Sequence, residues 1–325
     1  MNVNSSTIAD AGKPLVSIVT PSFNQGPFLE QTIRSVLEQD YPNIEYIVID
    51  GGSTDGSVDI IRRYAGRLAY WTSEPDHGQA DAINKGWSRS TGRILAFLNS
   101  DDYYTPGSVS TAVAALQRNP AAQIVIGQGR WVTENGQPLQ KVLFKYDGDA
   151  AHHLFDVDKY DSVPQPAAFV TRAVIDSVGL LDPSFHMGLD GEFFTRVLGN
   201  FEAVVTDDVL ACLRLHPSSK SVAGGIRFAA DILRVADLLL AQPEAYPRFR
   251  VDPRRVMSGA HIRAARVNYV NGKPLQAMRH LFIAASQSPK YWGIIALRDL
   301  PRLVLASVVG TSRYLRLSSA MRGTA

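Results

Sequence analysis

The sequence predicts an α/β fold in which a mostly parallel sheet, flanked by helices, is followed by a helical C-terminal extension. Short β-rich segments recur in the first third of the chain, and each precedes a polar turn and a segment of helical periodicity. Strands that alternate with helices favour a parallel sheet covered on both faces. Beyond residue 225 the β-rich segments stop, and Ala-, Leu- and Arg-rich segments follow. There we expect helices at Ile226–Leu240, Arg254–Tyr269, Pro274–Ser286 and from Trp292 to about Tyr314.

The elements of the first part follow one another along the chain. We expect strands at Leu15–Thr20, Ile44–Asp50 and Leu68–Thr72, and in the apolar run from Arg93 to Asn99. The expected helices are Phe28–Gln39, Ser57–Tyr64, Gln79–Arg89 and one that ends near Arg118.

Turn residues mark where two of these helices begin. The glycines of Gly51–Gly56 permit a tight turn, in which Ser53 or Asp55 is placed to cap the next helix. Thr105 followed by Pro106 is typical of an N-cap and a first helical position.

Acidic residues follow several of the expected strands. In parallel sheets, ligands bind beyond the carboxyl ends of the strands, so these residues are expected around one crevice. They are Asp50, Glu74, Asp76, Asp101 and Asp102. A buried strand that ends on the adjacent carboxylates Asp101 and Asp102 is a rigid platform for a hard divalent cation. The pattern indicates phosphate chemistry.

Five segments of the chain, in this order, resemble the inverting family 2 glycosyltransferases, which have the GT-A nucleotide-sugar-binding fold. No single segment is specific, but the ordered set is, and it extends from roughly Pro14 to Val222. The segments are Val16–Asn24, Ile47–Gly56, Asp81–Gly86, Leu98–Asp102 and Leu189–Glu192.

The resemblance implies a metal site. Asp102 corresponds to the last position of the family's Asp-X-Asp type motif, which holds Mn²⁺ or Mg²⁺ on the diphosphate of the donor. Asp101 is expected to contact the ribose or a metal-bound water, and His216 is a candidate metal ligand. The alternatives are a solvated turn pair of carboxylates and a structural histidine.

The resemblance also implies donor-binding residues. Asp50 is expected to accept a hydrogen bond from the base, beside a wall formed by Thr20 and Pro21, with Asn24 in the same matched segment. The alternative for Asp50 is a capping or turn residue. The chain departs from the commoner family pattern because Gly51 stands where a second aspartate often occurs, which leaves base specificity open.

Several residues are candidates to contact the diphosphate of the donor. Asp81 and Lys85 are expected near the diphosphate or the sugar hydroxyls, or else form a simple i,i+4 surface pair. Many relatives carry an arginine where Ile83 stands, so another cation is expected to serve the phosphates. Lys220 and Arg214 are the candidates.

Asp190 is the candidate general base. It resembles the family's acidic residue before a helix, which deprotonates the acceptor hydroxyl in a single in-line displacement. Glu192 is the rival base, and Asp190 is also suited to be the N-cap of a helix that begins near Gly191.

Composition is that of a protein with ample core, since 45% of the 325 residues are hydrophobic. A single cysteine, Cys212, offers neither a disulfide nor a thiolate metal cluster. The polar start of the chain does not resemble a signal peptide, and no segment is apolar enough to span a membrane, so a cytoplasmic location is expected.

Charge is uneven along the chain. Residues 1–225 contain 17 Lys and Arg against 26 Asp and Glu, a net charge of −9, whereas residues 226–325 contain 16 against 5, or +11. The basic helical end is expected to lie peripherally on an anionic membrane surface, or to pack on the catalytic domain. We expect a flexible tail (1–13), a catalytic domain (14–225) and a basic helical region (226–325).

These observations favour a metal-dependent inverting glycosyltransferase of the hexosyltransferase type in polysaccharide biosynthesis. It would move a sugar from a nucleotide-sugar donor, with UDP the favoured nucleotide, to a hydroxyl of a glycan or lipid-linked saccharide. A sugar nucleotidyltransferase and a non-catalytic nucleotide-sugar-binding scaffold are the alternatives. No nucleic-acid recognition motif accompanies the positive charge.

Overall fold

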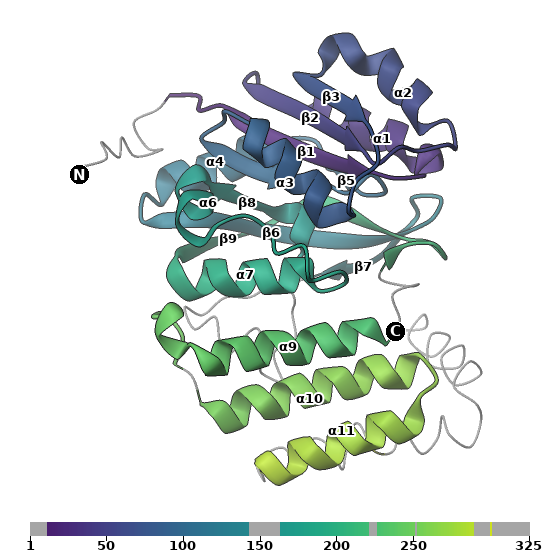
Figure 1. The fold of residues 1–325 in the computed structure, drawn as a ribbon. Helices are drawn as coiled ribbons and strands as arrows, with labels where there is room; N and C mark the ends of the chain where they lie inside the picture. Colours follow the sequence, from purple (N-terminus) through teal and green to yellow (C-terminus); the bar gives the residue numbers. More distant parts are fainter. Residues whose placement is uncertain (1–11, 143–162, 221–225, 251, 289–299, 301–325) are drawn as a thin grey trace. The chain divides into compact units, whose positions relative to one another are not determined.

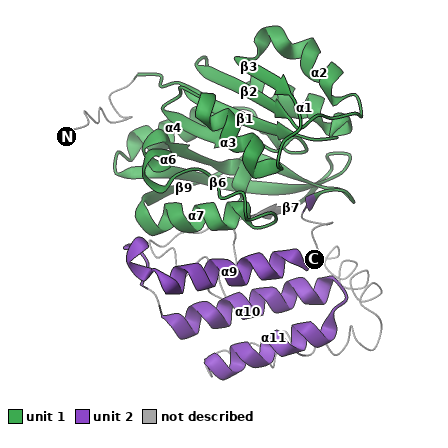
Figure 2. Cartoon of the chain, viewed as in Figure 1, with its two compact units in different colours: residues 1–148, 161–219 green, residues 149–160, 220–325 purple. Residues whose placement is uncertain are grey.

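The computed structural model describes residues 12–142, 163–220, 226–250, 252–288 and 300. The chain divides into two compact units, coloured separately in Figure 2. Unit 1 comprises Met1–Gly148 and Asp161–Ser219, and unit 2 comprises Asp149–Tyr160 and Lys220–Ala325. The proposed tail of residues 1–13 lies almost wholly outside the described residues.

One sheet forms the centre of unit 1 (Figure 1), with the strand order β3-β2-β1-β4-β8-β6-β9-β5 and β7 paired to β6. Its first four strands are β1 (Val16–Ser22), β2 (Ile44–Asp50), β3 (Tyr70–Ser73) and β4 (Ile94–Phe97). These four pair in parallel, as expected from the alternation of strands and helices. All seven residues of β1 are buried, since this strand has neighbours on both sides.

The other half of the sheet is mixed, which the sequence did not indicate. Its strands are β5 (Tyr103–Tyr104), β6 (Ala122–Thr133), β7 (Pro138–Val142), β8 (Ala168–Thr171) and β9 (Glu202–Leu215). Strand β8 runs antiparallel to β4 and β6, and β9 runs parallel to β6 but antiparallel to β5. Strand direction in this half depends on partners far away in the sequence, so no local pattern reveals it.

The helices of unit 1 are α1 (Gly26–Leu37), α2 (Ser57–Tyr64), α3 (Gln79–Arg89), α4 (Ser108–Arg118), α6 (Arg172–Val178) and α7 (Leu189–Asn200). Helices α2 and α3 have the expected bounds. Short 3₁₀ turns lie at Ala65–Arg67 (η2) and Gln165–Ala167 (η3).

Two capping predictions and the start of one helix were wrong. Helix α1 begins at Gly26, two residues early, because Pro27 suits its first turn. The N-cap of α2 is Gly56 and not Ser53 or Asp55. The N-cap of α4 is Gly107, at φ 78°, because Thr105 is engaged elsewhere: its hydroxyl donates to the Val209 carbonyl oxygen.

Unit 2 contains the expected helices α9 (Arg227–Ala241), α10 (Pro253–Val270) and α11 (Pro274–Gln287), with a 3₁₀ turn η4 (Pro243–Ala245). Asp252 caps α10 by accepting a hydrogen bond of 3.0 Å from the Arg254 backbone N–H. Helices α10 and α11 share a small core of Ile262, Ala265, Ala277, Leu281, Ala284 and Ala285. The helix expected from Trp292 to Tyr314 lies outside the described residues, except for Leu300.

Candidate active site

The carboxyl ends of the parallel strands come together at one edge of the sheet. Ser22, the last residue of β1, pairs with Asp50 at the end of β2, and Asp50 pairs with Ser73 at the end of β3. The turn that contains Asp101 and Asp102 follows β4, the neighbour of β1 on the other side. The fold therefore brings the sequence-predicted strand-end residues to the crevice expected for this sheet.

Asp50 is completely buried, with 0% of its surface exposed. Its Oδ2 accepts hydrogen bonds from the backbone N–H groups of Gly52 (3.1 Å) and Ser53 (2.9 Å) and from the Ser73 hydroxyl (2.7 Å). Its Oδ1 accepts one from the Ser53 hydroxyl at 2.6 Å. Asp50 thus ties the turn after β2 to the end of β3.

The turn after β1 is locked to the turn after β2. Asn24 adopts a left-handed backbone conformation (φ 52°), accepts a hydrogen bond of 2.9 Å from the Thr54 backbone N–H and donates from its own backbone to the Ser53 hydroxyl. Asp55 accepts a bond from the Gly26 backbone N–H. Burial opposes ionisation of Asp55, but the bonds from Ser57 and Gly26 outweigh it and lower its pKa.

The predicted wall residues Thr20 and Pro21 lie within β1 and are buried. The Thr20 hydroxyl shares a hydrogen bond of 2.9 Å with the phenol of Tyr46, in the interior of the sheet. The Thr20 side chain therefore links the end of β1 to β2 through Tyr46.

Asp102 is a buried carboxylate, with 6% of its surface exposed. Its Oδ1 accepts a hydrogen bond of 2.9 Å from the Arg214 backbone N–H, and its Oδ2 lies 3.3 Å from the Asn99 amide nitrogen. Burial and the neighbouring negative charge of Asp101 raise the pKa of Asp102. The Thr32 hydroxyl of α1 holds the turn by donating to the Asp102 carbonyl oxygen at 2.6 Å.

Arg214, near the end of β9, joins the acidic turn to helix α1 and to the turn that contains Glu134. Its Nε donates to the Asp101 carbonyl oxygen at 2.9 Å, and its guanidinium also donates to the Glu134 carbonyl oxygen and to Gln31 Oε1. The same group lies over the ring of Phe28, 4.9 Å from its centroid. Sequence reasoning offered Arg214 as a phosphate partner, but these bonds hold it inside the protein, with 5% of its surface exposed.

His216 is also buried, and its partner is Asp101. Its Nε2 lies 3.0 Å from Asp101 Oδ2, its Nδ1 lies 2.9 Å from the Ser218 hydroxyl, and its ring packs against Phe28 at 4.5 Å between centroids. The structure thus places both residues predicted for the metal site at the acidic turn. Asp102 is part of this turn, and His216 contacts its neighbour Asp101.

These residues fit a hard divalent cation. Among the described residues, no group of three or more His, Cys, Asp or Glu side chains is arranged to hold a metal. Magnesium, however, is usually bound by one or two carboxylates and substrate phosphates, so two protein ligands suffice when a diphosphate supplies others. The buried Asp102 beside Asp101 is a local excess of negative charge that a cation would neutralise.

Lys85 of α3 lies between two carboxylates. Its Nζ is 3.3 Å from Asp81 Oδ2 and 3.5 Å from Glu74 Oε1, so the i,i+4 pair exists. The His77 backbone N–H and Lys85 lower the pKa of Asp81. One third of the Lys85 side chain is exposed, at 33%. Lys220 is exposed and belongs to unit 2, whereas the other predicted site residues belong to unit 1.

The two candidate bases differ in their surroundings. Glu192 is buried, and both of its oxygens bind the Arg196 guanidinium, at 2.5 Å and 2.7 Å. Asp190 is half-buried, and its Oδ1 accepts a hydrogen bond of 2.9 Å from the Gly191 backbone N–H. The prediction that Asp190 is an N-cap was wrong, because α7 begins at Leu189 after Gly188, which places Asp190 in the first turn.

The sequence pattern assigned no role to Asn99, although it lies in the matched segment Leu98–Asp102. It accepts a bond of 2.6 Å from Gln79 at the start of α3, and it donates to Gln165 Oε1 at 3.1 Å. Gln165 in turn donates to the Phe97 carbonyl oxygen at 2.7 Å. An amide two residues before the paired carboxylates was the available signal. Asn99 links the acidic turn to the proline-flanked segment around Gln165.

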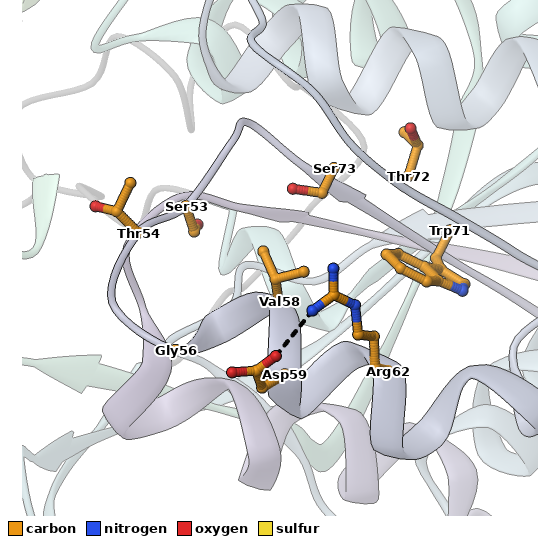
Figure 3. A pocket seen from close by; sticks show the side chains of 9 residues that line it. All are labelled: Ser53, Thr54, Gly56, Val58, Asp59, Arg62, Trp71, Thr72 and Ser73. Atoms are coloured by element: carbon orange, nitrogen blue, oxygen red, sulfur yellow. Dashed lines mark hydrogen bonds and ion pairs between the residues drawn. The ribbon is translucent and has the colours of Figure 1, made fainter.

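A separate pocket of about 640 Å³ lies between α2 and the edge strand β3 (Figure 3). Trp71 and Arg62 form one end of it, and Arg62 is paired with Asp59 at 2.9 Å. Ser53 and Ser73, which both donate to Asp50, form part of its wall. Asp101 and Asp102 are not among its lining residues, so the pocket adjoins the strand-end site without containing these two carboxylates.

Comparison with known proteins identifies the family. Residues 17–170 match the family described as Glycosyl transferase family 2. The uncharacterized glycosyltransferase Rv1514c of Mycobacterium tuberculosis is 33% identical over 233 residues, which cover 68% of this chain and 85% of that protein. The chain belongs to glycosyltransferase family 2. A putative teichuronic acid biosynthesis glycosyltransferase, TuaG of Bacillus subtilis, is 36% identical over 134 residues, which cover 40% of this chain and 53% of TuaG.

Solved structures confirm the GT-A fold expected for this glycosyltransferase. S. aureus TarS 1-349 in complex with UDP superposes with a TM-score of 0.60 at 16% identity, covering 96% of this chain and 92% of that one. The mannosyltransferase PcManGT from Pyrobaculum calidifontis, in complex with GDP-Man and Mn2+, also has a TM-score of 0.60, at 19% identity, covering 94% and 84% of the two chains.

Proposed function

We propose that this glycosyltransferase is a metal-dependent inverting hexosyltransferase that uses a nucleotide-sugar donor, with UDP the favoured nucleotide. The observation that carries the proposal is the pair Asp101 and Asp102, held at the end of a parallel strand by Arg214, His216 and Thr32. Structural neighbours are complexes with UDP, and with GDP-Man and Mn2+, which supports a nucleotide-sugar donor and a metal.

In this proposal, Asp102 holds a divalent metal, and His216 either ligates it or orients Asp101. When bound, such a metal would supply Lewis-acid stabilisation of charge on the departing diphosphate. Lys85 is partly exposed and would exchange a carboxylate partner for a phosphate. Asp50 and Asn24 would hold the turns beside the nucleoside in place. Thr20 and Pro21 would form the end of β1 next to them.

Asp190 is the proposed base. Both oxygens of Glu192 are bound to Arg196, so Glu192 would have to break a buried ion pair before it could accept a proton. Asp190 is half-buried in the first turn of α7, and Asn84 anchors α3 to Leu181, in the segment that leads to Asp190. A carboxylate that takes the acceptor proton during in-line attack would invert the anomeric configuration.

We also propose a glycan or lipid-linked saccharide as the acceptor, in polysaccharide assembly. The name of TuaG, a putative teichuronic acid biosynthesis glycosyltransferase, supports this acceptor class. No helix among the described residues has the length and hydrophobicity of a membrane span. The strongly basic residues 226–325 support peripheral contact with an anionic membrane surface, where lipid-linked saccharides are found.

A binding panel tests the donor site. UDP-, GDP- and dTDP-sugars are each titrated with and without Mn²⁺, using thermal shift and calorimetry, on the intact protein and on Asp102→Ala. We expect metal-dependent stabilisation by one nucleotide class and its loss in the variant. Release of that nucleoside diphosphate from the sugar nucleotide separates an enzyme from a non-catalytic scaffold, and absence of any nucleotide response would contradict the proposal.

A further inference from the structure

The buried Asp50 is already engaged by donors of the protein. Its Oδ2 accepts hydrogen bonds from the backbone N–H groups of Gly52 and Ser53 and from the Ser73 hydroxyl, and its Oδ1 accepts one from the Ser53 hydroxyl. Because none of its surface is exposed, a base could reach it only if the turn came apart.

Gly51, the next residue, leaves a space at the same strand ends. Its backbone N–H donates to the Ser22 carbonyl oxygen at 2.8 Å, which places it between the ends of β1 and β2. A Cβ built on Gly51 would lie 2.8 Å from Asp76 Oδ2 and 3.1 Å from Asp76 Cγ. Gly51 is not among the residues with positive φ, so it is the Asp76 carboxylate, and not the backbone conformation, that competes with a Cβ here.

Asp76 is held in this space by its own loop. Its Oδ1 accepts a hydrogen bond of 2.8 Å from the Gly78 backbone N–H, and the loop is tied to β2 because the Glu74 backbone N–H donates to the Asp50 carbonyl oxygen at 3.0 Å. Asp76 is partly exposed, and no hydrogen bond from the described residues reaches its Oδ2. This oxygen is therefore available to a ligand.

A second polar group near Gly51 also lacks a partner. The Ser22 hydroxyl is buried, with 3% of the residue exposed, and it has no hydrogen-bond partner among the described residues. Buried hydroxyls are nearly always paired, and one that is not indicates a missing water or ligand. It belongs to the residue whose carbonyl oxygen holds Gly51.

We propose that Asp76, and not Asp50, accepts the hydrogen bond from the base of the nucleotide donor, and that Gly51 is glycine to admit this carboxylate. The inference rests on the proposed nucleotide-sugar function and deepens it by naming the residue that determines base specificity. An ionised carboxylate only accepts hydrogen bonds, so the base must present an N–H group on its pairing edge. Uracil, thymine and guanine each carry such a ring N–H.

Calorimetric titration of the full-length protein with UDP, GDP and dTDP in the presence of Mn²⁺ provides the test. We expect Asp76→Ala to weaken the preferred nucleotide by about 10- to 100-fold, the range for a hydrogen bond to a charged group. Inorganic pyrophosphate with Mn²⁺ should bind the variant and the wild type equally, because it has no base. Asp59→Asn, which removes an exposed carboxylate of α2, is the control and should bind the nucleotide normally.

A relocated carboxylate sharpens the test. Gly51→Asp alone should weaken binding, because its Cβ would collide with Asp76. In the double variant Gly51→Asp/Asp76→Ala the obstacle is gone and a carboxylate returns to the same space, so nucleotide affinity should recover to within about threefold of wild type.

The outcomes separate this inference from the proposed function. If the wild type binds a nucleotide and Asp76→Ala binds it equally well, Asp76 does not contact the base and the inference fails alone. Equal losses of nucleotide and pyrophosphate affinity would show that Asp76 maintains the loop and would also overturn it. If the wild type binds no nucleotide, both the proposed function and the inference fail.

Discussion

Arg214 shows how a single buried side chain can hold an acidic turn in place. Its backbone N–H holds the Asp102 carboxylate, and its guanidinium holds the Asp101 carbonyl oxygen and the side chain of Gln31. Lysine has a single ammonium and cannot reproduce the planar fork that spans these acceptors. The position of the two carboxylates therefore depends on an arginine.

We expect Arg214→Lys to lower the free energy of unfolding by about 1–3 kcal/mol, because buried carbonyl groups lose their donors. It should also weaken Mn²⁺-dependent nucleotide binding by about tenfold. Urea unfolding and calorimetry measure the two effects. Arg63→Lys, at an exposed ion pair with Glu30, is the matched control and should change neither. Unchanged nucleotide affinity in Arg214→Lys would show that Arg214 does not position the acidic turn.

Single substitutions can show whether Asp190 or Glu192 is the general base. Asp190→Asn should reduce the transfer rate by about 10²- to 10⁴-fold, the range for loss of a general base, while the donor dissociation constant stays constant. Glu192→Ala should instead destabilise the protein by about 3 kcal/mol, because Arg196 loses its buried partner. Sugar-nucleotide turnover and thermal unfolding of both variants check this. An active Asp190→Asn would remove Asp190 from the mechanism.

At the scale of elements, Gly86 sets how closely α3 approaches β1. A Cβ on Gly86 would lie 2.4 Å from Cγ1 of Val19, which is completely buried. Gly86→Ala should therefore cost about 1–3 kcal/mol, because the helix must move away from the sheet. Gly191→Ala in α7 is the matched control, since a Cβ there meets nothing within 4 Å and should stabilise the helix by up to about 1 kcal/mol. Urea unfolding that shows equal stabilities would contradict this packing argument.

The helix pair α10–α11 contains a pH-sensitive contact. His261 Nδ1 lies 2.9 Å from His280 Nδ1, and burial, then the charge of His280, lower the pKa of His261 from 6.5 to about 4, although Asp237 opposes this. Burial, then Arg279, also lowers the pKa of His280. Between about pH 4 and pH 6.5 the unfolded chain binds more protons than the folded histidine pair, so the free energy of unfolding rises with pH across this window.

We therefore expect amide exchange in α10 and α11 to accelerate as the pH falls from 7.5 to 5.5, once the intrinsic exchange rate is corrected for. His261→Gln, which cannot become charged, should reduce this dependence. A dependence of the same size in His261→Gln would mean that other groups cause it.

Local signals explain which elements the sequence could predict. Helices α2 and α3 begin after glycine-containing turns and end with their apolar pattern, so both were located to the residue. The pairing of β6 with β9 and the bond between Asp50 and Ser73 depend on partners distant in the chain. For the same reason the pattern predicted Asp102 as a metal ligand but not the anchoring contacts of Arg214, and it noted Gly51 and Asp76 without relating the two residues.

At the scale of the whole molecule, charge and exposed apolar surface coincide in the C-terminal region. Residues 226–325 carry 16 Lys and Arg against 5 Asp and Glu. On α11, Leu275, Met278 and Phe282 are 80%, 37% and 57% exposed, and their spacing of three and four residues places them on one face. An exposed apolar helix face within a strongly basic region is typical of segments that lie in a membrane interface.

Full-length protein should therefore sediment with vesicles that contain anionic phosphatidylglycerol, and should remain in solution with vesicles of neutral phosphatidylcholine. Raising the salt concentration should release it, because the Debye length falls from about 10 Å at 0.1 M to about 3 Å at 1 M. The double variant Leu275→Gln/Phe282→Gln should bind more weakly. Leu139→Gln, at an exposed leucine of unit 1, controls for the general loss of surface hydrophobicity. If wild type and both variants bind anionic vesicles equally, the apolar face of α11 takes no part, and absence of binding at low salt would exclude membrane contact by this basic region altogether.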